Sequence, residues 1–108
     1  MDDKINHSEV FSFNEKANYS SDGIVSKRII QKKVGNVSLF AFDKGQELSE
    51  HSAPYDAIVQ VLEGEALVII NKVDYNLKAG QSIIMPAGIS HAVKAIEKFK
   101  MLLTMIRE

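Results

Sequence analysis

The side chains best suited to chemistry in this 108-residue chain are two of its three histidines, His51 and His91. Each follows a glycine by a short interval, and each is expected to begin a strand of otherwise apolar residues. Imidazole is a common ligand for divalent metals and a general acid or base near neutral pH. His7 lies in the polar N-terminal segment, where we expect it to be exposed. His51 and His91 are therefore the candidate functional pair, against the plain alternative of two hydrogen-bonded histidines at strand ends.

The apolar pattern that must position this pair has a period of two residues rather than 3.6, which predicts strands and not helices. Turn signals recur at intervals of roughly 8–12 residues, a spacing typical of an all-β sandwich or barrel. In a closed barrel strands alternate inward and outward positions, so residues near a strand's start can line one mouth, and histidines on neighbouring strands could meet there. The predicted strands cover residues 36–42, 56–62, 66–70, 73–77, 82–85, 91–95 and 99–106, and one helical turn is expected near 14–17.

Length and composition predict one globular domain over residues 1–108, with 45% hydrophobic and 25% charged residues. Lys and Arg number 13 and Asp and Glu 14, for a net charge of −1. We therefore expect no nucleic-acid partner, which would need a basic surface. The absence of cysteine excludes disulfides and thiolate metal sites. No apolar stretch approaches the roughly 18 residues of a membrane span, and the N-terminus lacks an apolar export segment, so we expect no membrane partner and a cytoplasmic location.

Two stretches resemble the paired motifs of the cupin superfamily. Residues 45–64, GQELSEHSAPYDAIVQVLEG, are similar to the first motif, Gly-x5-His-x-His followed by a glutamate and a glycine. Residues 80–95, GQSIIMPAGISHAVKA, are similar to the second, in which Gly80, Pro86, Gly88 and His91 fall on the expected positions. The resemblance implies a double-stranded β-helix (a jelly-roll, or cupin barrel) over 1–108, with an N-terminal arm over about 1–22. It also implies a divalent transition metal held at the barrel mouth by three histidines and one glutamate.

The first motif departs from the family pattern at two ligand positions. Ala53 stands where the second histidine is expected, and Ala57 where the glutamate is expected. Ala95 replaces the asparagine that usually closes the second motif. His51 and His91 remain, and two imidazoles are fewer than the three protein ligands usual in catalytic zinc sites.

Three substitutes could complete a metal site. Asp56 would face the histidines if a bulge shifted its strand by one residue. Tyr55 could reach the mouth, whereas strand alternation from Ala57 directs Gln60 outward. Thioethers could form a soft site favouring copper, although such residues are more often core filler. The methionines concerned are Met85, Met101 and Met105.

The alternative is a pocket that holds no metal tightly. Alanine at positions 53 and 57 is expected to enlarge the cavity and make it more apolar, as in many small-molecule sites. The candidate ligand-binding residues are His51, His91, Tyr55, Val59, Val61, Met85 and Met101. We expect a binding module for a small molecule or a weakly held metal. The alternatives are a metal-dependent enzyme of dioxygenase or isomerase type, and metal-free acid–base catalysis by the two histidines.

A homodimer is expected from apolar residues near the N-terminus. Residues 10–13, Val-Phe-Ser-Phe, alternate and could be exchanged as an added strand. With Ile24, Val25 and the outward face of the last strand, they would form an exposed apolar patch in a monomer. An edge strand within the same chain would explain the same residues.

Overall fold

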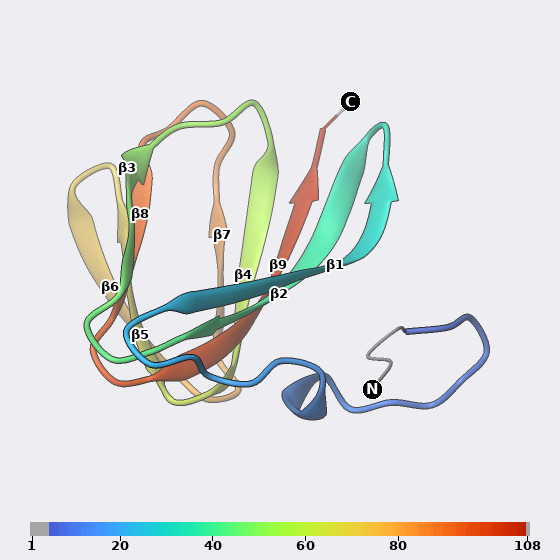
Figure 1. Cartoon of the computed structure of the whole chain (residues 1–108). Helices are drawn as coiled ribbons and strands as arrows, with labels where there is room; N and C mark the ends of the chain where they lie inside the picture. Colours follow the sequence, from blue (N-terminus) through green and yellow to red (C-terminus); the bar gives the residue numbers. More distant parts are fainter. Residues whose placement is uncertain (1–4, 108) are drawn as a thin grey trace.

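A computed structural model describes residues 5–107, which form nine strands and one short 3-10 helix (Figure 1). The elements are η1 (Phe13–Glu15), β1 (Ile24–Lys32), β2 (Gly35–Phe42), β3 (Glu47–His51), β4 (Asp56–Glu63), β5 (Glu65–Ile70), β6 (Val73–Lys78), β7 (Ser82–Met85), β8 (His91–Ala95) and β9 (Phe99–Ile106). Every pair of neighbouring strands is antiparallel. No helix among the described residues is long and apolar enough to cross a membrane.

The strands form two sheets that face each other across the core. The larger sheet has the order β1-β2-β9-β4-β7 and the smaller one β3-β8-β5-β6. From β3 onward most connections pass from one sheet to the other, so the chain winds around the core as a double-stranded β-helix. The predicted all-β class and jelly-roll architecture are therefore confirmed.

Alternation along β4 places its apolar residues in the core. Ala57, Val59 and Val61 are buried, whereas Gln60 between them is exposed. The inward register predicted from Ala57 is therefore confirmed, and it follows from the two-residue period of a strand. At the centre of the larger sheet β9 pairs with both β2 and β4, and β4 in turn pairs with β7, so strands of the two cupin-like motifs lie side by side.

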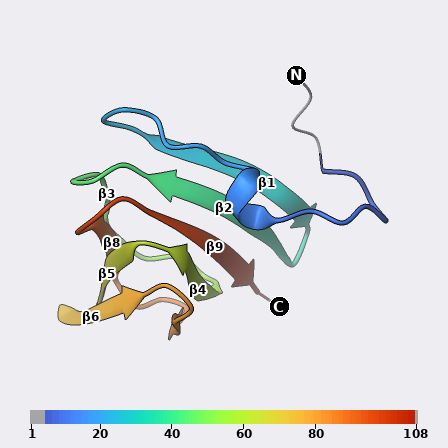
Figure 2. The same ribbon diagram turned by 90° about the horizontal axis from the view of Figure 1, so that it is seen from below.

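The N-terminal arm packs against its own domain, on the outer face of the larger sheet (Figure 2). Ala17 is buried against Leu39 and Ala41, and Phe13 packs beside them. Residues 10–13 form no strand in this chain, since Phe13 begins η1 and Val10 lies fully exposed. The apolar contacts of Phe13 and Ala17 therefore fix the path of the arm along the sheet.

A buried lysine ties the same arm to β4 and β9. Lys100 is only 6% exposed, and its Nζ donates to the Asn14 carbonyl at 2.5 Å and lies 3.6 Å from Glu63 Oε1. The Tyr19 hydroxyl donates to Glu63 Oε2 at 2.9 Å. Burial raises the pKa of the Tyr19 hydroxyl, and the hydrogen bond to the Glu63 carboxylate raises it further. Burial alone would raise the pKa of Glu63, but the Tyr19 hydrogen bond and the Lys100 charge bring it below its ordinary value.

Two strands were not predicted as such. In β1 a register shift between Arg28 and Ile30 interrupts the two-residue pattern, which hides the strand in the sequence. In β3 most residues are polar and exposed, so the segment lacks an apolar face. As a consequence His51 ends a strand rather than beginning one, while His91 begins β8 as expected.

Candidate functional site

The two predicted histidines meet on the smaller sheet. His51 at the end of β3 pairs directly with His91 at the start of β8. Their ring centroids are 4.5 Å apart, and the ring planes are inclined by 68°, an edge-to-face arrangement. The sequence-based prediction that these histidines lie side by side is correct.

Backbone hydrogen bonds between the two motifs hold this pair in register. The Gly88 N–H donates to the Ala53 carbonyl, and the Gly45 N–H donates to the Ala95 carbonyl, both at 2.9 Å. Gly88 has a φ of +74°, in the left-handed region that other residues rarely adopt. The turn before β8 therefore requires glycine at position 88. This turn places His91 at the start of β8, at the barrel mouth.

Main-chain carbonyls orient both rings. His51 Nδ1 lies 2.8 Å from the Ser49 carbonyl oxygen, and His91 Nδ1 lies 3.2 Å from that of Ile89. A carbonyl oxygen can only accept, so in each hydrogen bond the proton resides on Nδ1. Each neutral ring is left with a lone pair on Nε2, the arrangement that second-shell partners impose on metal-binding histidines.

Burial keeps His91 uncharged. His91 is only 6% exposed to solvent, whereas His51 is exposed. Burial lowers the pKa of His91 below its ordinary value of 6.5, and the neighbouring His51 ring lowers it further. At neutral pH His91 is therefore an acceptor at Nε2 and not a cation.

A cavity of about 40 Å³ lies beside the rings. Its walls are Leu48, His51, Ala57, Met85, His91, Val93, Met101, Leu103 and Met105. This volume admits one or two water-sized groups and is far below the roughly 300 Å³ of a small pocket for drug-sized ligands. The expected enlargement of the cavity is not observed, because the long side chains of Met85 and Met105 lie on either side of Ala57.

Methionines flank the position where the family places its glutamate. In the larger sheet Ala57 pairs with Met85 on β7 on one side and with Met105 on β9 on the other. Directly opposed residues of antiparallel strands project to the same face, so the three side chains form one row. This row belongs to one sheet, and the His51–His91 pair to the other.

The remaining predicted site residues lie outside the cavity. Val59 and Val61 are fully packed in the hydrophobic core. Tyr55 stacks under the Arg107 guanidinium, 5.1 Å from the ring centroid. Asp56 is exposed, and its Oδ1 accepts the Ala87 N–H at 2.9 Å. The β4 ladder is regular at Asp56, so the bulge that would have turned it inward is absent there.

The residues present do not fit the ligand set of three histidines and a glutamate. Within residues 5–107 no group of three or more His, Cys, Asp or Glu side chains could hold a metal ion. The cavity wall offers two imidazoles and three thioethers as its only side-chain donors. Sequence reasoning overlooked Leu48, Val93 and Leu103, although Leu103 shares the inward face of β9 with Met101 and could have been found from that alternation.

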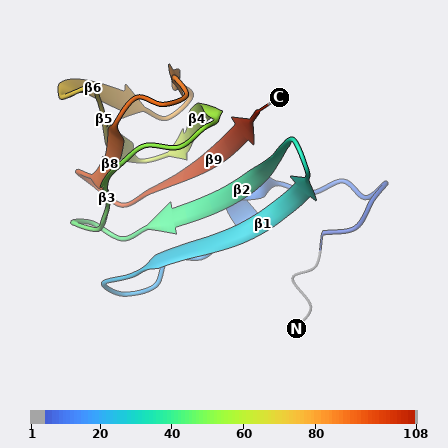
Figure 3. The same cartoon turned by 90° about the horizontal axis from the view of Figure 1, so that it is seen from above.

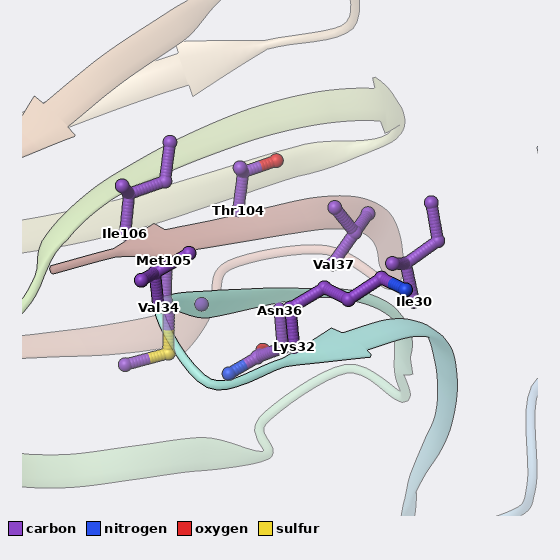
Figure 4. Close-up of a pocket in the computed structure, with 9 residues that line it drawn as sticks. Ile30, Lys32, Val34, Asn36, Val37, Thr104, Met105 and Ile106 are labelled. Carbon is purple, nitrogen blue, oxygen red and sulfur yellow. The ribbon is translucent and has the colours of Figure 1, made fainter.

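A shallow apolar groove adjoins the cavity at the end of the larger sheet (Figure 4). It has a volume of about 220 Å³ and lies between the tip of the β1–β2 hairpin and the end of β9. Ile30, Val34 and Ile106 line it and are 51%, 56% and 56% exposed. Met105 borders both the groove and the histidine cavity.

Comparison with known proteins supports the architecture. Residues 38–107 match the cupin domain family. A conserved protein of unknown function from Streptococcus pyogenes is 38% identical, with 96% of this chain and 91% of that one covered and a TM-score of 0.92. A search of curated proteins found no match.

Two further solved structures bear on size and fold. A cupin 2 conserved barrel domain protein from Leptotrichia buccalis is 38% identical, with a TM-score of 0.87 over 90% of this chain. The match covers 47% of that protein, so the chain spans about half its length. A cupin superfamily protein from Desulfitobacterium hafniense has a TM-score of 0.90 at 22% identity, covering 96% and 95% of the two chains, and shares the fold.

Proposed function

Because the chain belongs to the cupin domain family, we propose that it works at the barrel mouth, as a binding module whose ligand contacts His51 and His91. The ligand is a molecule of a few atoms or a weakly held metal ion. The observation that carries this proposal is the pair of imidazoles, 4.5 Å apart, whose Nδ1 atoms both face main-chain carbonyls. Two lone pairs held beside a small apolar cavity favour a ligand with a donor hydrogen or an empty coordination position.

Binding is favoured over catalysis by the character of the cavity wall. Apart from the histidines, its residues are Leu, Val, Ala and Met. None of these side chains transfers a proton at neutral pH, so an acid–base step would rest on the two histidines alone, with no further group to assist it. Among residues 5–107, the metal-dependent dioxygenase or isomerase that was the alternative expectation finds no third His or carboxylate donor beside the pair.

Elemental analysis combined with native mass spectrometry tests this proposal. Tag-free protein is analysed as purified and after separate reconstitution with manganese, iron, nickel, copper and zinc. We expect one bound ion or small molecule per chain, lost in a His51→Ala/His91→Ala variant. A His7→Ala variant is the matched control and should retain the ligand. Retention in the double variant, or an empty site under every condition, would overturn the proposal.

We further propose that the chain forms a homodimer through the groove beside the β1–β2 hairpin, with a second copy as the occupant. Strand β1 is an edge of the larger sheet, and its hairpin extends that sheet beyond the smaller one (Figure 3). The apolar side chains of Ile30, Val34 and Ile106 at the groove are more than half exposed. In an isologous dimer, this same patch on each of two copies would cover the other. A cytoplasmic location stays a prediction.

A further inference from the structure

We propose that the cavity beside His51 and His91 is a binding site for a monovalent soft metal ion, Cu(I), held by both imidazoles and by the thioethers that flank Ala57. This inference rests on the proposed function, because it names the ligand of the same site. It departs from the three-histidine, one-glutamate set that the fold family implies and that the residues present do not fit.

The distribution of methionine is the first support. The chain has four methionines, and all three that follow Met1 line this one cavity. They come from two strands, β7 and β9, and alternate with other apolar residues in the core. Thioether sulfur is a soft ligand that selects Cu(I) among biological metals.

The geometry of the two facing sheets is the second support. Met85 and Met105 are the direct cross-strand neighbours of Ala57, one on each side. Alanine in place of the expected glutamate leaves the space between these two side chains without a carboxylate. The pair His51 and His91 borders the same cavity from the opposite sheet. Residues that carry sulfur and nitrogen donors thus line a space of about 40 Å³, which admits a single ion.

Charge is the third support. Every donor in the cavity wall is neutral when each histidine carries a single proton, on Nδ1. Without a carboxylate or thiolate, nothing in the wall offsets the charge of a divalent ion, and burying an uncompensated charge is costly. A singly charged ion pays a smaller desolvation cost than a doubly charged one of similar size. Neutral soft donors in an apolar wall therefore favour Cu(I) over Zn²⁺, Mn²⁺ or Fe²⁺.

The test is an anaerobic competition titration of Cu(I) against the chromophoric chelator bicinchoninate, with tag-free protein. We expect one Cu(I) per chain and sulfur scattering at the bound ion in X-ray absorption spectra. A Met85→Leu/Met105→Leu variant keeps the side-chain volume but removes two sulfurs. It should bind Cu(I) about tenfold more weakly or worse, a loss of about 1.4 kcal/mol or more. Leu39→Met, a similar exchange in the outer cluster that contains Ala17, is the control and should leave affinity unchanged.

The outcomes separate this inference from the proposed function. If Cu(I) does not bind, or binds equally well without the two thioethers, the inference is overturned. If another ion or a small molecule still binds in a manner that requires His51 and His91, the proposed function stands alone. If the His51→Ala/His91→Ala variant binds Cu(I) as tightly as the unaltered chain, the inference is overturned. If that variant also retains every other ion or molecule that the unaltered chain binds, the proposed function is overturned as well. Circular dichroism of each variant distinguishes lost binding from lost folding.

Discussion

At the scale of single residues, alanine at positions 53 and 57 defines what the site can hold. Ala57 is 2% exposed and lies between two methionines, in a wall without charge. An ionised side chain placed there would lose its hydration without gaining a partner, unless a cation entered with it. Alanine at position 57 therefore supplies no metal ligand, but it spares the metal-free protein the cost of burying a charge.

Restoring the family's ligands tests this argument. In an Ala53→His/Ala57→Glu variant, burial should raise the pKa of the introduced carboxyl well above its ordinary value, at a cost of about 3 kcal/mol at neutral pH. Zinc at 100 times its Kd should return about 2.7 kcal/mol. Thermal unfolding with and without zinc measures both effects. A variant as stable as the original chain, or one indifferent to zinc, would show that Ala57 does not face an enclosed apolar space.

The Glu63 carboxylate should govern part of the acid sensitivity. Its pKa is below 4.5 in the folded chain, so the unfolded chain takes up the proton first as the pH falls. Its contribution is complete above about pH 4.5 and is lost as the pH falls through the folded-state pKa. Because the side chain is 38% exposed, we expect a contribution on the order of 1 kcal/mol.

Urea unfolding between about pH 7 and 3 checks this prediction. A Glu63→Gln variant should be less stable at neutral pH, since buried Lys100 loses its ion-pair partner, and its stability should fall less on acidification. Glu97→Gln is the control, because Glu97 forms an exposed ion pair with Lys44 and should contribute under about 0.5 kcal/mol. Parallel pH curves for the original chain and Glu63→Gln would contradict the assignment.

At the scale of elements, two glycines with similar backbone angles should differ in their tolerance of substitution. Gly64 has a φ of +81° and Gly80 of +89°. A Cβ on Gly64 would lie 2.0 Å from the Lys98 carbonyl oxygen, whereas a Cβ on Gly80 would meet open space. The turn before β5 therefore requires glycine for space as well as conformation.

Gly80→Ala should cost about 1–2 kcal/mol through the left-handed backbone alone. Gly64→Ala should cost a further 1–3 kcal/mol, because the backbone of the β8–β9 connection must move. Urea midpoints of the two variants measure the difference. Equal losses of stability in the two variants would mean that the β8–β9 connection moves at little cost to accommodate the added methyl group.

Element prediction succeeded wherever strands alternate cleanly between core and solvent. The β4 segment shows this, since Ala57 and Val59 face inward and Gln60 outward. It failed for β1, whose bulge breaks the period, and for β3, whose residues are mostly polar. The histidine pair was predictable because turn glycines and Pro86 mark the strand ends. The cavity volume was not, since it depends on how methionine side chains from two strands fill the space beside Ala57.

At the scale of the whole molecule, the groove beside the β1–β2 hairpin should determine the oligomeric state. Sedimentation velocity at micromolar concentration should show a dimer. Ile30→Asp/Val34→Asp should shift it to a monomer, because burying two carboxylates against an apolar surface is costly. Ile84 on β7 is 62% exposed and lies outside the groove, so Ile84→Asp should remain dimeric. A monomeric original chain would contradict the proposed interface.

The most direct measurement of the central claim is a long-range ¹H–¹⁵N spectrum of the imidazole rings, before and after addition of the ligand that the chain retains. The account predicts a proton on Nδ1 of both His51 and His91, because the carbonyls of Ser49 and Ile89 can only accept, and an unprotonated Nε2 on His91. Ligand addition should shift both Nε2 resonances together and leave His7 unchanged. Protons on Nε2, or a ligand that shifts neither ring, would contradict the account.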